Sequence, residues 1–147
     1  MRVFGAMPSW LRLLAVRVGT PSFTAGAVLV LRRPDGRVLL VLQRHTGAWA
    51  LPGGLLRRRE DAVDGLVREV AEEVGVRLDP EELPVPRAVV DARARRIDLV
   101  FPLDAPDDRD AHVAAEDEVR RIGWFRLDDL PELTEPTPAI LAAVRRP

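Results

Sequence analysis

The chain of 147 residues contains no cysteine, so it forms neither a disulfide framework nor a thiolate metal site. A lack of disulfides is typical of proteins in a reducing compartment, and we expect this protein to be cytoplasmic. The length favours a single domain over residues 1–147, because a hydrophobic core of that size needs no disulfide or metal to support it.

The sequence also lacks an excess of charge of either sign. Its 22 basic residues nearly balance its 23 acidic residues, so the overall field gives no reason to expect attraction to nucleic acid polymers or to membranes. Binding of an anionic small molecule must therefore come from a local group of residues.

No long hydrophobic run is present either. Residues 3–14 are moderately apolar, but Pro8 and Arg12 interrupt them and no small-residue cleavage site follows. This segment predicts neither a signal peptide nor a membrane span.

Apolar side chains recur at helical spacing in residues 8–18, and Arg12 and Arg17 lie off that stripe. The pattern predicts a short amphipathic N-terminal helix within an extension of residues 1–20. We expect this helix to pack on the domain or on a second copy of the chain rather than on a membrane.

Short apolar segments bounded by turn residues predict several strands. The expected strands cover residues 23–31, 38–42, 49–51, 87–91, 97–103 and 119–125. The turn Pro34-Asp35-Gly36 joins the first two, and Pro52-Gly53-Gly54 should begin a loop, because neither a helix nor a regular sheet tolerates it well.

The remaining segments complete an α/β pattern. Residues 138–144 predict a short terminal helix, and residues 104–110 resemble a disordered loop. Several strands around one strong central helix indicate a mixed α/β layer architecture.

The stretch Glu60–Gly75 is predicted to form the central helix. At about 100° per residue, one stripe holds five apolar side chains, Val63, Leu66, Val67, Val70 and Val74. Glu69, Glu72 and Glu73 occupy a separate arc. Glu69 lies three residues before Glu72 and four before Glu73, so each of these pairs repels by about a few tenths of a kcal/mol unless a cation lies among the carboxylates.

An acidic stripe on a helix is normally only a solvated face, but two neighbouring features favour a metal site. Hard carboxylate oxygens suit Mg²⁺ or Mn²⁺, and the preceding Gly53-Gly54 can bring backbone carbonyls close to the same ion. Arg68, beside the arc, can hold Glu60 through a forked ion pair and so fix the loop against the helix.

These residues resemble the Nudix box at every defining position. Gly54 is followed after five residues by Glu60, and after seven more by residues 68–76, which read REVAEEVGV. The segments WALPGG at 49–54 and WFRLDDL at 124–130 also look like that family. The resemblance implies an α/β/α sandwich with a mixed central β-sheet, in which a loop-helix-loop binds a divalent metal and hydrolyses a diphosphate linked to another moiety.

The resemblance also implies roles for single residues. Glu69, Glu72 and Glu73 would ligate Mg²⁺ or Mn²⁺, and the carbonyl of Gly53 would be a further ligand. Either Glu72 or Glu73 would accept the proton of the attacking water, although family members also draw this base from loops outside the box.

Glu60 and Arg68 would be structural members of the box. Glu118 falls where the family often supplies another acidic ligand, with Glu116 and Asp117 as nearby competitors. An ordinary surface carboxylate is an equal alternative for Glu118.

Three further residues are candidates for substrate binding. Arg57 stands where many family members carry an extra glutamate, and it either reaches a substrate phosphate or only keeps the loop soluble. Arg44 can bind a phosphate but is equally well a surface cation, and its neighbour His45 is expected to be structural. Trp49 can stack on a base, but an aromatic residue before Pro-Gly-Gly more often packs against the sheet.

Signatures of several subfamilies are absent. The chain has no tyrosine. The downstream tyrosine associated with dinucleoside-polyphosphate hydrolases is therefore missing. It also lacks the downstream proline typical of ADP-ribose hydrolases, the upstream signature of coenzyme A hydrolases, and the cysteine expected for isomerisation of an isoprenoid diphosphate. By elimination, the expected substrate is a small-molecule phosphoanhydride: a nucleoside di- or triphosphate, or a nucleoside diphosphate linked to another moiety.

The alternative function is a catalytically silent Nudix-fold module that senses a nucleotide. Such modules often lose a box glutamate, whereas Glu69, Glu72 and Glu73 are all present here. A homodimer is a further expectation, because dimers are common in the family.

Overall fold

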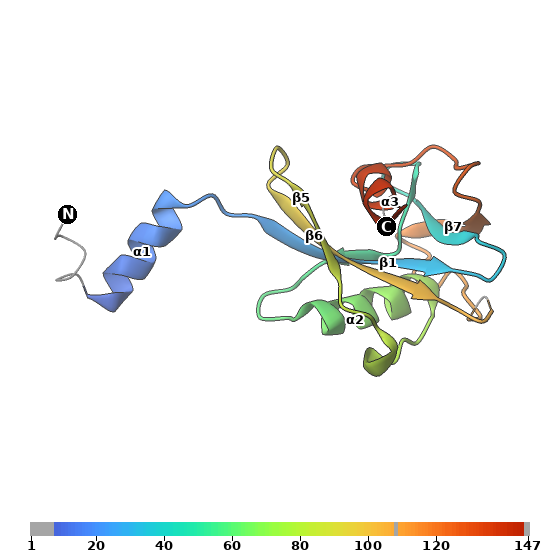
Figure 1. Cartoon of the computed structure of the whole chain (residues 1–147), viewed down its shortest axis with the longest axis horizontal. Helices are drawn as coiled ribbons and strands as arrows, with labels where there is room; N and C mark the ends of the chain where they lie inside the picture. Colours follow the sequence, from blue (N-terminus) through green and yellow to red (C-terminus); the bar gives the residue numbers. More distant parts are fainter. Residues whose placement is uncertain (1–7, 108, 146–147) are drawn as a thin grey trace.

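The computed structural model of the protein describes residues 8–107 and 109–145. Its elements in chain order are α1 (Ser9–Gly19), β1 (Thr24–Arg32), β2 (Val38–Gln43), β3 (Trp49–Ala50), β4 (Gly53–Leu55), α2 (Ala62–Val74), the 3₁₀ turn η2 (Pro80–Glu82), β5 (Arg87–Asp91), β6 (Arg96–Asp104), β7 (Val119–Phe125) and α3 (Thr137–Arg145) (Figure 1). The strands and helices expected from the sequence are all present within two residues of their predicted ends.

The strands form one mixed sheet of seven. Its order is β3-β2-β1-β6-β5, with β4 paired to β1 and β7 paired to β2. β1 and β6 run parallel over their whole lengths, and the other pairs are antiparallel. β1 and β2 are paired only at Arg32↔Val38. The two halves of the sheet therefore diverge from that point, and we call the opening between them the fork.

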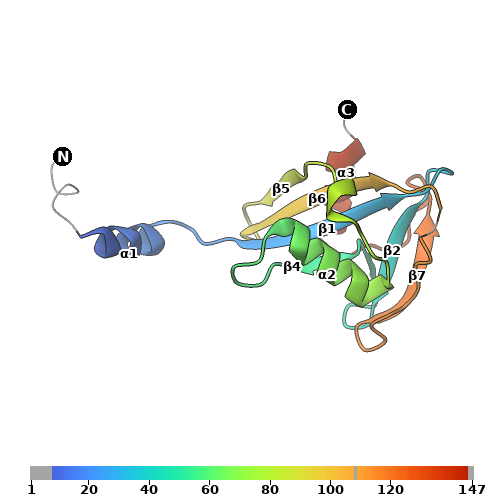
Figure 2. The same cartoon turned by 90° about the horizontal axis from the view of Figure 1, so that it is seen from below.

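The sheet is the middle layer of three. Helix α2 covers one face and α3 the other (Figure 2). Because successive side chains of a strand point to opposite faces, Leu29 and Phe101 pack beneath α2, while Val28 and Val100 pack beneath α3. None of the helices in the described part of the chain has the length and apolarity that crossing a bilayer requires.

Helix α2 has well-defined ends. The Asp61 carboxylate accepts hydrogen bonds from the backbone N–H groups of Val63 and Asp64, at 2.9 and 3.0 Å, and so caps the first turn. The helix ends at Gly75, whose φ of 68° is left-handed and where a Cβ would lie 2.2 Å from the ring of His112. The predicted apolar stripe faces the sheet: Leu66, Val70 and Val74 are fully buried, and Val63 and Val67 are partly buried.

The prediction that a loop begins at Pro52-Gly53-Gly54 is wrong. Gly53–Leu55 forms β4 and pairs antiparallel with β1. The missing side chain is what permits this pairing, since a Cβ on Gly53 would lie 2.2 Å from the carbonyl oxygen of Ala27. Glycine, usually unfavourable in a strand, serves here for close approach of two backbones.

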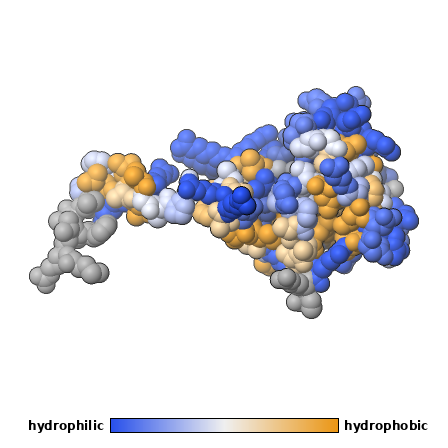
Figure 3. Space-filling view, turned by 90° about the horizontal axis from the view of Figure 1, so that it is seen from above, coloured by the Kyte–Doolittle hydropathy of each residue, from blue (hydrophilic) through white to orange (hydrophobic). Residues whose placement is uncertain are grey.

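Of the two packing surfaces expected for the N-terminal helix, the structure does not place the helix on the domain. No described residue of α1 is buried, and the helix stands away from the sheet, with apolar side chains in view (Figure 3). Trp10 is 65% exposed and Val18 82%. Thr20 is extended, as expected before Pro21, and this directs the helix outward. Packing on a second copy stays a prediction, and residues 1–7 of the extension lie outside the described residues.

The loop after β6 is more ordered than predicted. Asp104 still belongs to β6, Ala105 is buried, and the Arg109 guanidinium donates hydrogen bonds of 2.7 and 2.8 Å to the Glu82 carboxylate. This ion pair fastens the loop to η2, which the sequence analysis did not predict. Asp108 lies outside the described residues.

Candidate metal centre

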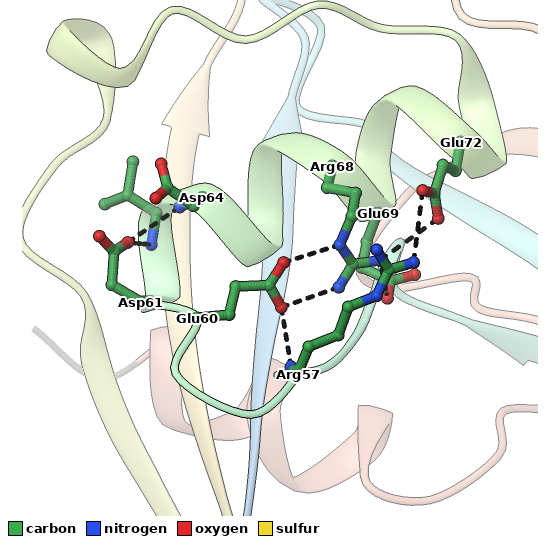
Figure 4. Close-up of polar contacts among 8 residues, drawn as sticks. Arg57, Glu60, Asp61, Asp64, Arg68, Glu69 and Glu72 are labelled. Carbon is green, nitrogen blue, oxygen red and sulfur yellow. Dashed lines mark hydrogen bonds and ion pairs between the residues drawn. The ribbon is translucent and has the colours of Figure 1, made fainter.

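A forked ion pair joins the loop before α2 to the helix itself. Arg68 Nε and Nη2 donate to the two carboxylate oxygens of Glu60, at 2.8 and 2.9 Å (Figure 4). The backbone N–H of Arg57 donates to the same carboxylate at 2.8 Å. The hydrogen bonds from Arg68 and then Arg57 lower the pKa of Glu60 to about 2. The ion pair expected between these two side chains is thus present.

Two guanidinium groups lie beside the carboxylates of Glu69 and Glu72 on α2. Arg68 Nη1 donates to Glu69 Oε1 at 2.6 Å and to Glu72 Oε2 at 3.3 Å. Arg57 Nη2 lies 3.7 Å from Glu72 Oε1. These contacts offset the repulsion within the acidic arc, which we define as Glu69, Glu72 and Glu73. They also place Arg57 beside the arc, while its role toward a substrate remains a prediction.

Glu73 differs from the other two members of the acidic arc because it is 6% exposed. Its Oε2 accepts a hydrogen bond of 2.9 Å from the backbone N–H of Gly53. The pKa of Glu73 is raised to about 7: burial raises it most, the hydrogen bond from the Gly53 N–H lowers it, and the charges of Glu69, Glu118 and Glu72 raise it. The Glu118 carboxylate is therefore near enough to act on the arc, although it comes from the segment before β7.

The two glycines of β4 are fitted against the acidic arc. A Cβ on Gly54 would lie 2.6 Å from the carboxyl carbon of Glu69, and Gly53 presents its N–H to Glu73. The diglycine thus leaves space that the carboxylates occupy. A larger residue at Gly54 would displace Glu69.

The donor set fits a hard divalent cation. The charges of Glu69, Glu72 and Glu118 all act on Glu73 beside a glycine strand, and oxygen ligands of this kind suit Mg²⁺ and Mn²⁺. Within residues 8–107 and 109–145, however, no three acidic or histidine side chains already converge as a metal site. The carboxylates of Glu69 and Glu72 accept hydrogen bonds from Arg68, and that of Glu73 accepts one from the Gly53 N–H. Binding of a cation would require these carboxylates to exchange such hydrogen bonds for the ion.

Arg44 lies at the end of β2 and contacts the segment that carries Glu118. Its backbone N–H donates to the Glu118 carbonyl at 2.8 Å, and its Nε donates to the Glu116 carbonyl. Arg44 therefore fastens this segment to the sheet, a contact over more than seventy residues that the sequence analysis had no means to predict. Binding of a phosphate by Arg44 remains a prediction.

Trp49 packs within the domain. Its ring meets that of Phe125 edge to face, with centroids 4.7 Å apart and planes at 69°. It is partly buried against the apolar cluster beneath α3. This is the packing role that the sequence favoured over stacking on a base.

A pocket of about 230 Å³ opens on the other side of Gly53 from the acidic arc. Arg96 lines it and is held by Asp98, a buried residue of β6. Neither residue belongs to a motif that could be recognised in the sequence. The available signal was one acidic residue inside the apolar stretch Ile97-Asp98-Leu99-Val100.

Comparison with known proteins identifies the family. The sequence profile of the NUDIX domain matches residues 22–144. The chain belongs to the Nudix family. The solved structure of a MutT NUDIX hydrolase from Burkholderia pseudomallei is similar to this Nudix chain, with a TM-score of 0.65 and 32% identity, over 85% of this chain and 98% of that one. The family resemblance and the α/β fold predicted from the sequence are thereby confirmed.

Two curated relatives match parts of this Nudix chain. A MutT-like protein of Streptomyces ambofaciens is 40% identical over 63 residues, which cover 43% of this chain and 41% of the relative. An ADP-ribose pyrophosphatase of Methanocaldococcus jannaschii is 28% identical over 110 residues, which cover 67% of this chain and 60% of the relative. The chain spans less than two thirds of the length of either relative.

Proposed function

We propose that this protein is a divalent-metal-dependent pyrophosphohydrolase. Its substrate would be a nucleoside di- or triphosphate, or a nucleoside diphosphate linked to another moiety. The observation that carries the proposal is the gathering of the acidic arc and Glu118 beside the diglycine strand. Family membership supports hydrolysis, and the Methanocaldococcus relative is named for cleavage of the same type of bond.

The acidic arc would hold Mg²⁺ or Mn²⁺, with Glu118 and the carbonyl of Gly53 as further ligands. When bound, the ion would neutralise phosphate charge and lower the pKa of a water molecule. The exposed guanidinium of Arg57 lies beside the arc, where it would meet substrate phosphate oxygens.

Glu60 and Arg68 would act on the geometry of the site and not on the substrate. The ion pair between these two side chains fixes the loop before α2 against the helix that carries the arc. For the proton of the attacking water, Glu72 and Glu73 are the two candidate acceptors. Glu72 is 52% exposed and open to solvent, whereas Glu73 is bound to the Gly53 N–H.

A phosphate-release screen tests the proposal. Nucleoside triphosphates, nucleotide sugars, ADP-ribose and dinucleoside polyphosphates would be incubated with Mg²⁺ or Mn²⁺ and the intact chain, Glu72→Gln or Glu73→Gln. We expect turnover that requires the metal and falls by about 10²–10⁴-fold in each variant. Glu81→Gln, on exposed η2, is the matched control and should be fully active.

Two results would contradict this function. Turnover without added metal, or at an unchanged rate in both arc variants, would rule out the mechanism. No turnover on any substrate, together with tight nucleotide binding, would instead assign the chain to the nucleotide-sensing modules.

A further inference from the structure

Helix α1 exposes an apolar surface that no described part of the chain covers. Its exposed large apolar side chains, each between 51% and 82% exposed, are Trp10, Leu13, Leu14, Val16 and Val18. Trp10, Leu14 and Val18 are spaced four residues apart and so share one face of the helix. Only residues 20–23 join α1 to β1, and the extended backbone before Pro21 directs the helix away from the domain (Figure 1, Figure 2). An exposed apolar surface of this kind indicates a binding partner.

The end of the domain next to α1 carries a cluster of arginines. The backbone N–H of Thr24, the first residue of β1, donates to the Arg95 carbonyl in the β5–β6 turn at 2.9 Å, and across β1 the Leu56 N–H donates to the Ala25 carbonyl at 2.9 Å. The loop 56–61 and the β5–β6 turn therefore flank the start of β1, where α1 leaves the domain (Figure 1). Their exposed arginines and those of α1 form what we call the basic end: Arg12, Arg17, Arg57, Arg58, Arg59, Arg93 and Arg95.

Few acidic partners balance the basic end. Among the described residues, Arg57 is the one member of this set with an ion pair, 3.7 Å from Glu72. Residues 1–34 contain no aspartate or glutamate. The loop, the turn and α1 hold three acidic residues, of which Arg68 neutralises the first: Glu60, Asp61 and Asp91. The expectation of no attraction to membranes rested on the net charge of the chain, and the local charge at this end differs from it.

A lipid surface offers partners for both the apolar helix and the arginines. A nucleic acid polymer would pair its phosphates with the arginines but leave the apolar side chains of α1 in water. A second copy meeting this end with its own α1 would bring two basic ends together, and like charges repel. Elsewhere in the described chain, the large apolar side chains that stay exposed are single residues on separate segments: Phe23, Leu55, Val85 and Val90. An anionic bilayer supplies phosphate for the guanidinium groups and hydrocarbon for α1.

We propose that α1 and the basic end dock this protein on the surface of an anionic lipid bilayer. The apolar face of α1 would lie at the boundary between headgroups and acyl chains, and the arginines would contact lipid phosphates. One weak anchor gives only marginal membrane binding, whereas an apolar helix and a polybasic surface at the same end of the molecule act together. This docking does not depend on hydrolysis at the acidic arc.

Sedimentation with lipid vesicles tests the proposal. The full chain in chelator would be mixed with large unilamellar vesicles of phosphatidylcholine alone, or of an equal mixture of phosphatidylcholine and phosphatidylglycerol. We expect binding to the anionic vesicles that added salt weakens, and only marginal binding to the neutral ones. Tryptophan emission should shift to shorter wavelength on binding, and Trp10→Phe should abolish the shift, because Trp10 is 65% exposed in the free protein.

Charge and apolarity are separated by variants. Arg58→Gln combined with Arg59→Gln should weaken binding to anionic vesicles by about tenfold or more. Arg120→Gln combined with Arg121→Gln removes the same charge from exposed positions of β7, and this matched control should bind like the natural chain. Leu14→Ser should weaken binding by about tenfold. Because α1 buries no residue, the thermal unfolding of this variant should be unchanged.

Several results would overturn the proposal. Absence of binding to anionic vesicles, equal binding to neutral ones, or an equal loss in the β7 control would each exclude docking by the basic end. Binding of a single-stranded RNA oligonucleotide that depends on Arg58 and Arg59, without vesicle binding, would assign the basic end to nucleic acid. A dimer in size-exclusion chromatography that Leu14→Ser dissociates, without vesicle binding, would assign α1 to a second copy.

Discussion

At the scale of single residues, Glu73 links ionisation to stability. In the metal-free protein its pKa is about 7, raised from 4.5 mainly by burial. The folded state therefore holds the proton more tightly than the unfolded state, and this stabilisation is complete below about pH 4.5 and lost as the pH rises through about 7. We expect Glu73 to lower the free energy of unfolding between about pH 5 and pH 8 by on the order of 3 kcal/mol.

Urea unfolding in chelator at a series of pH values measures this effect. Glu73→Gln is neutral at every pH, so its stability should fall less than that of the natural chain over the same range. Parallel pH profiles for the two proteins would show that Glu73 is not the group responsible.

The adjacent glycines of β4 should respond differently to alanine. In Gly53→Ala the new Cβ would meet the backbone of Ala27 at 2.2 Å, and its φ of 134° is strained for alanine, so we expect a loss of stability of about 2–3 kcal/mol. In Gly54→Ala the three atoms nearest to the Cβ all belong to the flexible Glu69 side chain, so stability should change by less than about 1 kcal/mol while metal affinity falls.

Thermal unfolding and isothermal titration with Mn²⁺ separate these two outcomes. Gly36→Ala is the control, because a Cβ there meets no atom within 4 Å, although its φ of 80° is also positive. Normal metal affinity in Gly54→Ala would show that the position of Glu69 against this glycine is unimportant.

At the scale of elements, the forked ion pair between Arg68 and Glu60 holds the loop 56–61 to α2. Arg68→Lys keeps the charge but removes the planar fork, so the loop should open more often. We expect faster amide hydrogen exchange in residues 56–61 and little change in β6. A double-mutant cycle with Glu60→Gln should be non-additive, and independent effects would exclude a direct coupling of the two side chains.

Elements that a short stretch of the sequence specifies by itself were predictable. The stripe of α2 follows from its helical periodicity, the strands β5 and β7 follow from short apolar segments bounded by turn residues, and the motif identified Glu69, Glu72 and Glu73 together. β4 was missed because its pairing depends on the space that Gly53 leaves beside β1. The contacts of Arg44 with the segment before β7, and the pocket formed by Arg96, arise between residues far apart in the chain, where no local pattern exists.

At the scale of the whole molecule, α1 contributes no buried surface to the domain. Deletion of residues 1–20 should therefore change the free energy of unfolding by less than about 0.5 kcal/mol. Chemical denaturation of the full and shortened chains measures this. A clearly less stable shortened chain would mean that α1 packs on the domain or on another copy in solution, which size-exclusion chromatography of both chains would resolve.

The single residue pair between β1 and β2 also bears on how the protein can acquire new specificity. The fork places the proposed chemistry on one side of β4 and the pocket lined by Arg96 on the other, with Gly53 between them. Substitutions at Arg96 or Thr134 would then alter the lining of the pocket without changing a carboxylate of the arc. A duplicate of this gene could thus change the pocket in single steps, each of which keeps all the carboxylates of the arc.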